Sequence, residues 1–191
     1  MSPTDPPAPL GLEAGVVRLV ASDPAWPALF AAEAARLRGA LAGAPGSAAD
    51  GPLPIALEHI GSTAVPGLAA KPVLDLLAGY PGGAPVAPYV RALEAAGYVH
   101  RGEQGIPGRE FFRRGTPRAY HLHLAVRGGA FWREHLAFRD ALRDDPVLRD
   151  AYAALKWALA RRHPRDREAY TEGKTAFVRR AVAAALPPAG G

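Results

Sequence analysis

A single run of residues, His59–Asp75, limits the folds open to this chain more than any other part of it. The apolar residues that lead into it, Leu53–Leu57, predict a β-strand, and that strand ends at Gly61-Ser62. A second strand is predicted at Pro72–Leu77, after a tight Pro66-Gly67 turn. Because a Gly-Ser step at a strand end leaves backbone N–H groups and a hydroxyl free, it can hold phosphate oxygens. The run therefore predicts two strands with an anion site between them.

Two carboxylates mark the ends of this segment. Asp75 lies inside an apolar strand, where a lone carboxylate is costly to bury, so we expect it to bind a metal ion or another cation. Glu58 is the candidate for a second carboxylate, catalytic or metal-binding, and His59 is either a site residue or a core histidine. The alternative for the whole run is an ordinary turn followed by a buried, hydrogen-bonded aspartate.

The length and composition suit one domain. At 191 residues the chain can bury a core, and we expect a disordered lead over 1–14 and a single domain over 15–187. The absence of cysteine excludes disulfides, zinc–thiolate sites and thiol catalysis. Met1–Gly11 lacks the apolar core of a signal peptide, and no apolar stretch approaches the roughly twenty residues of a membrane span. We therefore expect a cytoplasmic protein with no membrane partner.

The positive charge of the chain comes almost entirely from arginine. The formal net charge is +5, and 20 of the 23 basic residues are Arg. These arginines are interspersed with acids, as in Arg133-Glu134 and Arg139-Asp140, which is typical of solvated helix surfaces. We therefore expect a phosphate-bearing small molecule as ligand in preference to nucleic acid, and RNA binding stays a third, weaker alternative.

Strand patterns occupy the middle of the chain and helical patterns its two ends. Besides the two above, the predicted strands are Val16–Val20, Tyr98–Glu103, Arg109–Arg114 and Ala119–Val126. The predicted helices are Asp23–Leu41, Pro85–Ala96, Phe131–Arg143, Val147–Arg161 and Asp166–Leu186, with a Gly43–Pro54 loop after the first. This order predicts an α+β domain with a central β-sheet flanked by helices and a helical C-terminal third.

Two histidines share one face of a predicted strand. His121 and His123 are two residues apart, so both imidazoles point to the same side, while Leu122 and Leu124 point to the other. Together with Asp75, such a pair can bind a divalent metal (Mg, Mn or Zn) or a phosphate. The alternative is a polar, solvent-facing sheet surface.

Cationic side chains complete the candidate site. Lys71 is one of only three lysines and can meet a phosphate or pair with Glu58, unless it is a solvated loop residue. Arg109 suits bidentate phosphate binding, with a plain salt bridge as the alternative. Lys174 lies on the apolar stripe of the last helix, so it either reaches into the site or extends to solvent. The residues expected to hold the phosphate oxygens directly are Gly61, Ser62 and Thr63.

The two helices before the last one carry apolar stripes at helical spacing. His135 lies on the first stripe and Tyr152 on the second. We therefore assign both side chains to the core, with His135 structural and not catalytic.

Several segments together resemble the GrpB family, which is uncharacterised and has a nucleotidyltransferase-like fold. The segments that carry the resemblance lie between about residues 16 and 182: they are Asp23–Phe30, Glu58–Asp75, Ala95–Tyr98, Tyr120–His123, His135–Asp140, Tyr152–Lys156 and Tyr170–Lys174. The resemblance implies a nucleotidyltransferase-like mixed central sheet. Related domains also occur fused to dephospho-coenzyme A kinases, which associates the family with nucleotide or coenzyme A metabolism.

The family name does not specify a reaction, and our first hypothesis is a nucleotidyltransferase-like enzyme that acts on a nucleotide or coenzyme A-related ligand with one divalent metal. Polymerising and adenylating members of that fold use two carboxylates two residues apart and a third on a later strand. In this chain Leu77 stands at the paired position after Asp75, and the later strand offers His121 and His123 instead of an acid. The alternative is a non-catalytic ligand-binding domain of the same fold. We expect Ser62 at the rim of the shared pocket.

Overall fold

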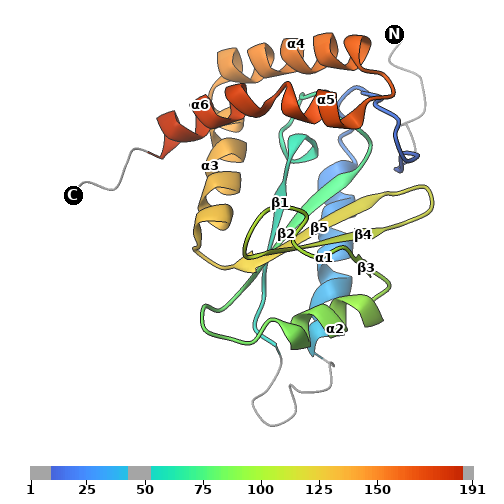
Figure 1. The fold of residues 1–191 in the computed structure, drawn as a ribbon, viewed down its shortest axis with the longest axis vertical. Coiled ribbons are helices and arrows are strands. Elements are labelled where there is room, and N and C mark those ends of the chain that lie inside the picture. The colour runs from blue at the N-terminus through green and yellow to red at the C-terminus, as the bar shows by residue number, and fades with distance from the viewer. Residues whose placement is uncertain (1–9, 43–52, 187–191) are drawn as a thin grey trace.

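A five-stranded mixed β-sheet forms the centre of the computed structural model, which describes residues 10–42 and 53–186 (Figure 1). The strands are β1 (Ala56–Ile60), β2 (Leu74–Tyr80), β3 (Val99–His100), β4 (Arg109–Arg114) and β5 (Tyr120–Val126). Their spatial order is β1-β2-β5-β4-β3, in which β2 and β5 are parallel and all other neighbours are antiparallel. Because β2 and β5 are central, their side chains are positioned by strands on both sides.

Six helices flank the sheet in the described chain, and the last four of them make up its C-terminal third. They are α1 (Trp26–Ala42), α2 (Ala87–Ala95), α3 (Ala130–Asp144), α4 (Pro146–Arg162), α5 (Arg167–Glu172) and α6 (Thr175–Ala185), with a 3₁₀ turn, η1 (Ser62–Ala64), after β1. This arrangement confirms the α+β prediction, with a mixed central sheet and a helical C-terminal third. Within the described ranges, none of these helices combines the length and the apolar character that a membrane span needs.

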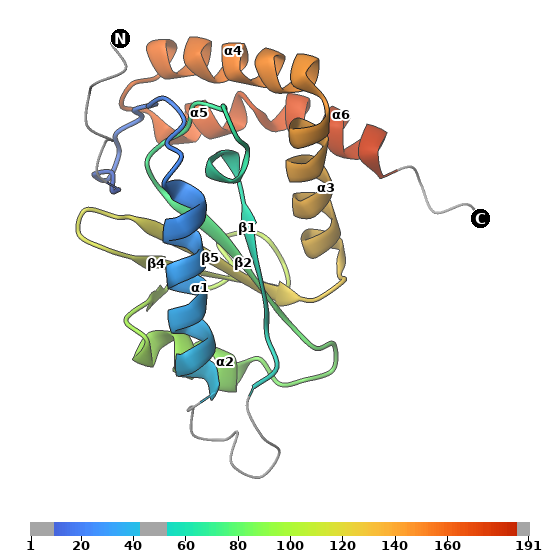
Figure 2. The same ribbon diagram turned by 180° about the vertical axis from the view of Figure 1, so that it is seen from behind.

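The helices divide between the two faces of the sheet. Trp26 and Leu37 of α1 and Leu93 of α2 pack on Leu76 and Leu122, on one face, and together they form the main core. The opposite face is covered by α3, while α4, α5 and α6 lie together across one end of the sheet (Figures 1 and 2). The second face of the sheet is therefore bordered by helices of the C-terminal third.

Local sequence explains where α4 and α5 begin. Asp145 accepts hydrogen bonds from the N–H groups of Val147 and Leu148, and Pro146 occupies the first helical position of α4. Asp166 caps α5 in the same way by accepting from the Ala169 N–H. Both Asp residues follow the start signals expected from the sequence.

A buried carboxylate joins α1 to the far strands of the sheet. Glu33 is only 4% exposed, and its two oxygens accept from Arg36, Tyr98 and Arg114 at 2.5–2.8 Å. Two guanidinium groups and a phenol therefore compensate one buried negative charge. The contact ties α1 to β4 across the face that lies opposite the candidate site.

Replacing this carboxylate should destabilise the fold. Glu33→Gln leaves the half-buried Arg114 without a charged partner, so we expect a loss of roughly 2–3 kcal/mol in the free energy of unfolding. Urea unfolding followed by circular dichroism measures it. Glu94→Gln, at an exposed position of α2, is the matched control and should change stability little. Equal stabilities of the two variants would show that the Glu33 network contributes nothing.

The structure corrects several predicted boundaries near the N-terminus. Val16–Val20 is not a strand, because it makes one isolated bridge, between Val20 and Ala70, while Val17 and Leu19 pack elsewhere as buried side chains. Leu12 belonged to the predicted disordered lead, but it is buried and bridges Arg118. Residues 1–9 of that lead and residues 43–52 of the predicted loop lie outside the described residues.

The predicted last helix is two helices. The break falls at Gly173 and Lys174, between α5 and α6. Gly173 packs so closely on α4 that a Cβ atom there would lie 2.5 Å from Leu159 Cδ2, and glycine is also a weak helix former. The packing against α4 thus redirects the chain, and Lys174 lies at the bend instead of inside a continuous helix.

Candidate functional site

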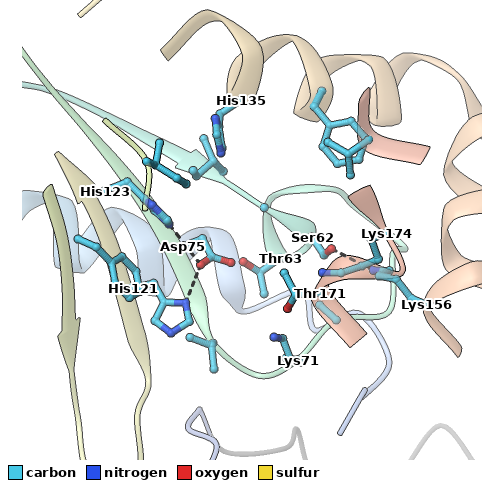
Figure 3. A pocket seen from close by; sticks show the side chains of 18 of the residues that line it. Ser62, Thr63, Lys71, Asp75, His121, His123, His135, Lys156, Thr171 and Lys174 are labelled. Atoms are coloured by element: carbon cyan, nitrogen blue, oxygen red, sulfur yellow. Dashed lines mark hydrogen bonds and ion pairs between the residues drawn. The ribbon is translucent and has the colours of Figure 1, made fainter. Parts of the chain in front are cut away.

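The parallel pairing of β2 and β5 brings the predicted carboxylate and histidines together. Asp75 lies opposite His121, and Leu77 lies opposite His123, all on the face that α3 covers. His121 Nδ1 is 2.9 Å from Asp75 Oδ1, and His123 Nε2 is 3.9 Å from the same oxygen (Figure 3). The expected adjacency of these three side chains is confirmed.

Of Asp75, His121 and His123, only the aspartate is charged near neutral pH. Burial acts to raise the pKa of Asp75, but the hydrogen bond from His121 and the nearby imidazole of His123 outweigh it and hold that pKa well below the ordinary value. Burial lowers the pKa of both histidines, against the opposing effect of Asp75. An ionised carboxylate therefore lies between two neutral imidazoles. His121 donates its Nδ1–H to Asp75, which leaves Nε2 as the basic nitrogen, buried and without a hydrogen-bond partner among the described residues.

Arg109 determines the tautomer of the second histidine. Its Nη1 is 3.4 Å from His123 Nδ1, and because a guanidinium only donates, Nδ1 must accept and the proton sits on Nε2, facing Asp75. Arg109 also donates to the carbonyl of Glu103 at 2.5 Å and lies over the Phe111 ring. It is buried and has no carboxylate partner among the described residues. Its expected contact with phosphate stays a prediction.

All three lysines of the chain converge beside Asp75 (Figure 3). Lys71 and Lys174 lie over the Tyr170 ring, with Nζ 5.2 and 4.6 Å from its centroid. Lys156 is 1% exposed and donates to Ser62 Oγ at 3.0 Å and to the carbonyl oxygen of Ala69. In the described part of the chain, no carboxylate lies within ion-pair distance of any of the three.

Burial and mutual repulsion make these lysines weak bases. Burial lowers the pKa of Lys71 to about 8. Burial and the charges of Lys174 and Lys71 lower the pKa of Lys156 to about 7, and burial and the charge of Lys71 lower that of Lys174 to about 7. The cluster is therefore only partly charged near neutral pH, and an anion placed among the three ammonium groups would favour their protonated forms.

Lys156 is the site residue that sequence reasoning missed. The Tyr152 stripe was assigned to the core, yet Tyr152 and Lys156, one helical turn apart on α4, both line the cavity. The available signal was composition: a chain with 20 arginines uses lysine at three positions only, and Lys156 is one of them. His135 also lines the cavity, although its Nδ1–H is donated to the Phe131 carbonyl at 2.8 Å.

Two predicted site residues have polar groups engaged by other residues of the protein. Glu58 lies on the Asp75 face, but its carboxylate accepts from Arg139 of α3 at 2.7 Å and does not line the cavity, so the structure does not bring it to Asp75. Thr63 lies at the cavity wall, but its hydroxyl is engaged with His59 Nε2 at 3.0 Å. His59 itself points to the opposite face and stacks on Phe30, as a core histidine does.

The remaining predicted residues line one cavity of about 550 Å³ between the sheet and the C-terminal helices. Its floor is the Asp75 face of β2 and β5, and η1 contributes Ser62. Lys156 closes it from α4, and Lys174 approaches from the bend between α5 and α6. The expected approach of Lys174 and the rim position of Ser62 are both present (Figure 3).

The donors around Asp75 do not fit a metal ion as they are arranged. Asp75 Oδ1 is hydrogen-bonded directly to His121 Nδ1, so the two atoms face each other with no space for an ion between them. Across residues 10–42 and 53–186, no group of three or more His, Asp or Glu side chains is placed to hold one. The divalent-metal prediction therefore stays a prediction, and no chemical step is derived through a metal.

Gly61 makes room for Asp75. Its φ of +72° lies in the left-handed region, and a Cβ atom there would lie 2.6 Å from Asp75 Oδ2. The glycine predicted to hold phosphate thus serves the geometry of the carboxylate: only a residue without a side chain lets β1 turn into η1 directly over Asp75.

The Gly61 contact gives a stability prediction with an internal control. Gly61→Ala should lower the free energy of unfolding by roughly 2–4 kcal/mol, because it adds left-handed strain and overlaps Asp75. Gly67→Ala has the same kind of strain, at φ +76°, but no atom within 4 Å of the new Cβ. Thermal unfolding of both variants isolates the contact. Equal losses would mean that Asp75 moves aside freely.

The fold and the cavity define an α+β protein with a cavity lined by basic side chains, and comparison with known proteins gives its family. Residues 16–184 match the family described as GrpB protein, and the chain belongs to the GrpB family. A UPF0157 protein of Pseudomonas aeruginosa is 43% identical over 175 residues, which is 89% of this chain and 68% of that protein. The crystal structure of conserved protein GrpB from Enterococcus faecalis superposes with a TM-score of 0.75 at 34% identity, covering 88% of this chain and 96% of that one.

A longer relative carries the same region. A protein named dephospho-CoA kinase, of Mycolicibacterium paratuberculosis, is 31% identical over 189 residues, which is 85% of this chain and 44% of that protein. This chain therefore corresponds to less than half of that relative.

Proposed function

We propose that this protein binds a phosphate-bearing small molecule, of the nucleotide or coenzyme A-related class, in the cavity between the sheet and α3–α6. The observation that carries the proposal is the convergence of Lys71, Lys156 and Lys174 near Ser62 without a carboxylate partner in the described chain. Buried like charges repel one another, so such a cluster is stabilised by an anion. A phosphoryl group supplies both the charge and the acceptor oxygens.

The contrast with other buried cations of the chain supports an external anion. Arg139 and Arg114, which are also largely buried, pair with Glu58 and Glu33 inside the protein. The lysines instead surround open space, in a cavity whose volume of about 550 Å³ is in the range of small-molecule sites. Phe138 and Ile106 add apolar wall, which suits the organic part of such a ligand.

The family relationship narrows the ligand class. The match to part of a protein named dephospho-CoA kinase favours a ligand from nucleotide or coenzyme A chemistry. The Gly61-Ser62 turn followed by Asp75 on the next strand resembles the corresponding elements of the nucleotidyltransferase fold, which bind nucleotides.

Nucleotidyl transfer on the same ligand is the second candidate function, and the Asp75–His121 pair favours it. A carboxylate that accepts Nδ1–H holds an imidazole in one tautomer and leaves Nε2 basic, as in other acid–base pairs. The fold's usual second carboxylate is replaced by Leu77, so the two-carboxylate form of the reaction does not apply. Binding without turnover is therefore the first candidate and transfer the second.

Binding should depend on the lysine cluster. Isothermal titration with ATP and coenzyme A, with and without Mg²⁺, Mn²⁺ or Zn²⁺, is expected to detect a complex with the wild-type protein. Lys174→Met should weaken it at least tenfold, because one of three phosphate-facing charges is lost. Arg91→Met, on exposed α2, removes the same charge far from the cavity and should leave affinity unchanged. If neither ligand binds with any metal, the proposal fails; release of pyrophosphate or AMP would promote the second candidate.

Affinity for phosphate should fall as pH rises from 7 to 9. The free lysines have pKa values of about 7 to 8, and a bound anion raises them, so binding takes up protons and weakens as the lysines deprotonate. Phosphate monoesters are already dianionic over this range, so their own titration contributes little. Titrations of AMP at pH 7, 8 and 9 measure the slope, and Lys174→Met should reduce it. A flat profile would show that the lysines are not the contacts.

A further inference from the structure

A second group of cations, Arg113, Arg118 and Arg167, lies at or beside the same cavity. Arg113 of β4 lies opposite His121 of β5 in the sheet, on the cavity face, and Arg167 begins α5; both line the cavity. Arg118 is buried near them, and its charge acts on Lys71 and His121. Figure 3 shows His121 and His123 on one side of Asp75 and the lysines on the other, so Arg113 belongs to the histidine side.

These three arginines have no internal compensation in the described part of the chain. None of them has a carboxylate within ion-pair distance. Arg113 Nε and the Nε and Nη2 atoms of Arg118 are buried without a hydrogen-bond partner. Burial and the charges of neighbouring arginines lower the pKa of both Arg113 and Arg118, so their charges oppose one another. Buried guanidinium groups in proteins are normally paired, so the buried Arg118 and the half-buried Arg113 and Arg167 beside it would be stabilised by an anion.

The two ends of the cavity are separated across the sheet. Ser62, which accepts a hydrogen bond from Lys156, follows β1, while Arg113 is on β4, on the other side of the central pair β2 and β5. At about 4.8 Å between neighbouring strands, β1 and β4 are roughly 14 Å apart. Arg167 is close enough for its charge to act on Lys71 and Lys174 as well as on Arg113. A single phosphoryl group at Ser62 and Lys156 therefore does not also contact Arg113.

We propose that Arg113 and Arg167, reinforced by the charge of the adjacent Arg118, form a second anion subsite, so that the ligand carries two anionic groups joined by a spacer. One phosphoryl group lies among the lysines at Ser62 and the other between the arginines, with the organic part passing over Asp75 and His121. Arginine suits the second subsite because its planar guanidinium group can bind two phosphate or carboxylate oxygens at once. This inference rests on the proposed phosphate binding and specifies its ligand class: a molecule with two separated phosphoryl groups, such as a nucleoside 3′,5′-bisphosphate.

Titrations of three nucleotides test the subsite in the full chain. Adenosine 3′,5′-bisphosphate, AMP and ADP differ in whether a second phosphoryl group is separated, absent or adjacent. The wild-type protein is expected to bind the bisphosphate at least tenfold more tightly than AMP and more tightly than ADP. In Arg113→Met and Arg167→Met, the preference should fall to about twofold or less while AMP affinity is kept. AMP thus reports both on folding of the variant and on the lysine subsite.

Matched variants separate charge from packing. Arg165→Met, exposed and two residues before Arg167, should keep the full preference, and Arg167→Lys should keep part of it. Equal wild-type affinities for AMP and the bisphosphate would overturn the second subsite while leaving phosphate binding intact, and so would an advantage for ADP alone. A variant that weakens AMP and the bisphosphate equally would also overturn it. If none of the three nucleotides binds, the proposed function itself fails.

Discussion

The parallel pairing of β2 with β5 is the constraint on which the site depends. It puts Asp75 and His121 directly opposite each other on central strands, where the backbone of each is hydrogen-bonded on both sides. A carboxylate buried at this position needs a donor, and the His121 imidazole supplies one at 2.9 Å. The close passage of Gly61 over the same carboxylate then determines where η1 and Ser62 lie. One polar pair thus links the sheet register, the turn after β1 and the rim of the cavity.

Charge is distributed differently on the two faces of the sheet. On the α1 face, Glu33 is compensated by Arg36 and Arg114 within the protein, which joins helix and strand. On the cavity face, Asp75 accepts a hydrogen bond from a neutral histidine, and the basic side chains around it outnumber this one carboxylate. In the first arrangement the charges are paired within the protein, which serves stability. In the second the positive charges exceed the negative ones, and this excess is what supports the proposed ligand site.

The cavity face carries both lysine and arginine, and the two side chains differ in their chemistry. Lysine changes its protonation state readily when buried, so the charge of the three lysines depends on what surrounds them. Arginine stays charged throughout the physiological range and offers a fork of fixed geometry. In the proposed complex, the lysine group makes phosphate binding sensitive to pH, whereas the arginine group contributes a constant attraction.

Sequence alone was sufficient for features whose cause is local. Period-two patterns predicted β4 and β5 nearly residue for residue, Asp145-Pro146 predicted the start of α4, and the spacing of His121 and His123 predicted their common face. The partnership of Asp75 with these histidines followed from the single assumption that the two strands are neighbours. Ser62 and Lys174 were also predicted at the cavity, and the structure has them there.

Tertiary structure alone decided the features that depend on partners distant in the sequence. Glu58 carries the same charge as Asp75, but Arg139 of α3 neutralises it, and no local pattern specifies that contact. Lys156 and Tyr152 follow a helical period that indicates core, and only the packing of α4 over η1 turns them toward Ser62. Val16–Val20 alternates like a strand yet finds no strand to pair with. Periodicity records which face of an element is apolar; which element covers that face, and whether open space is left between them, is set by packing across the whole chain.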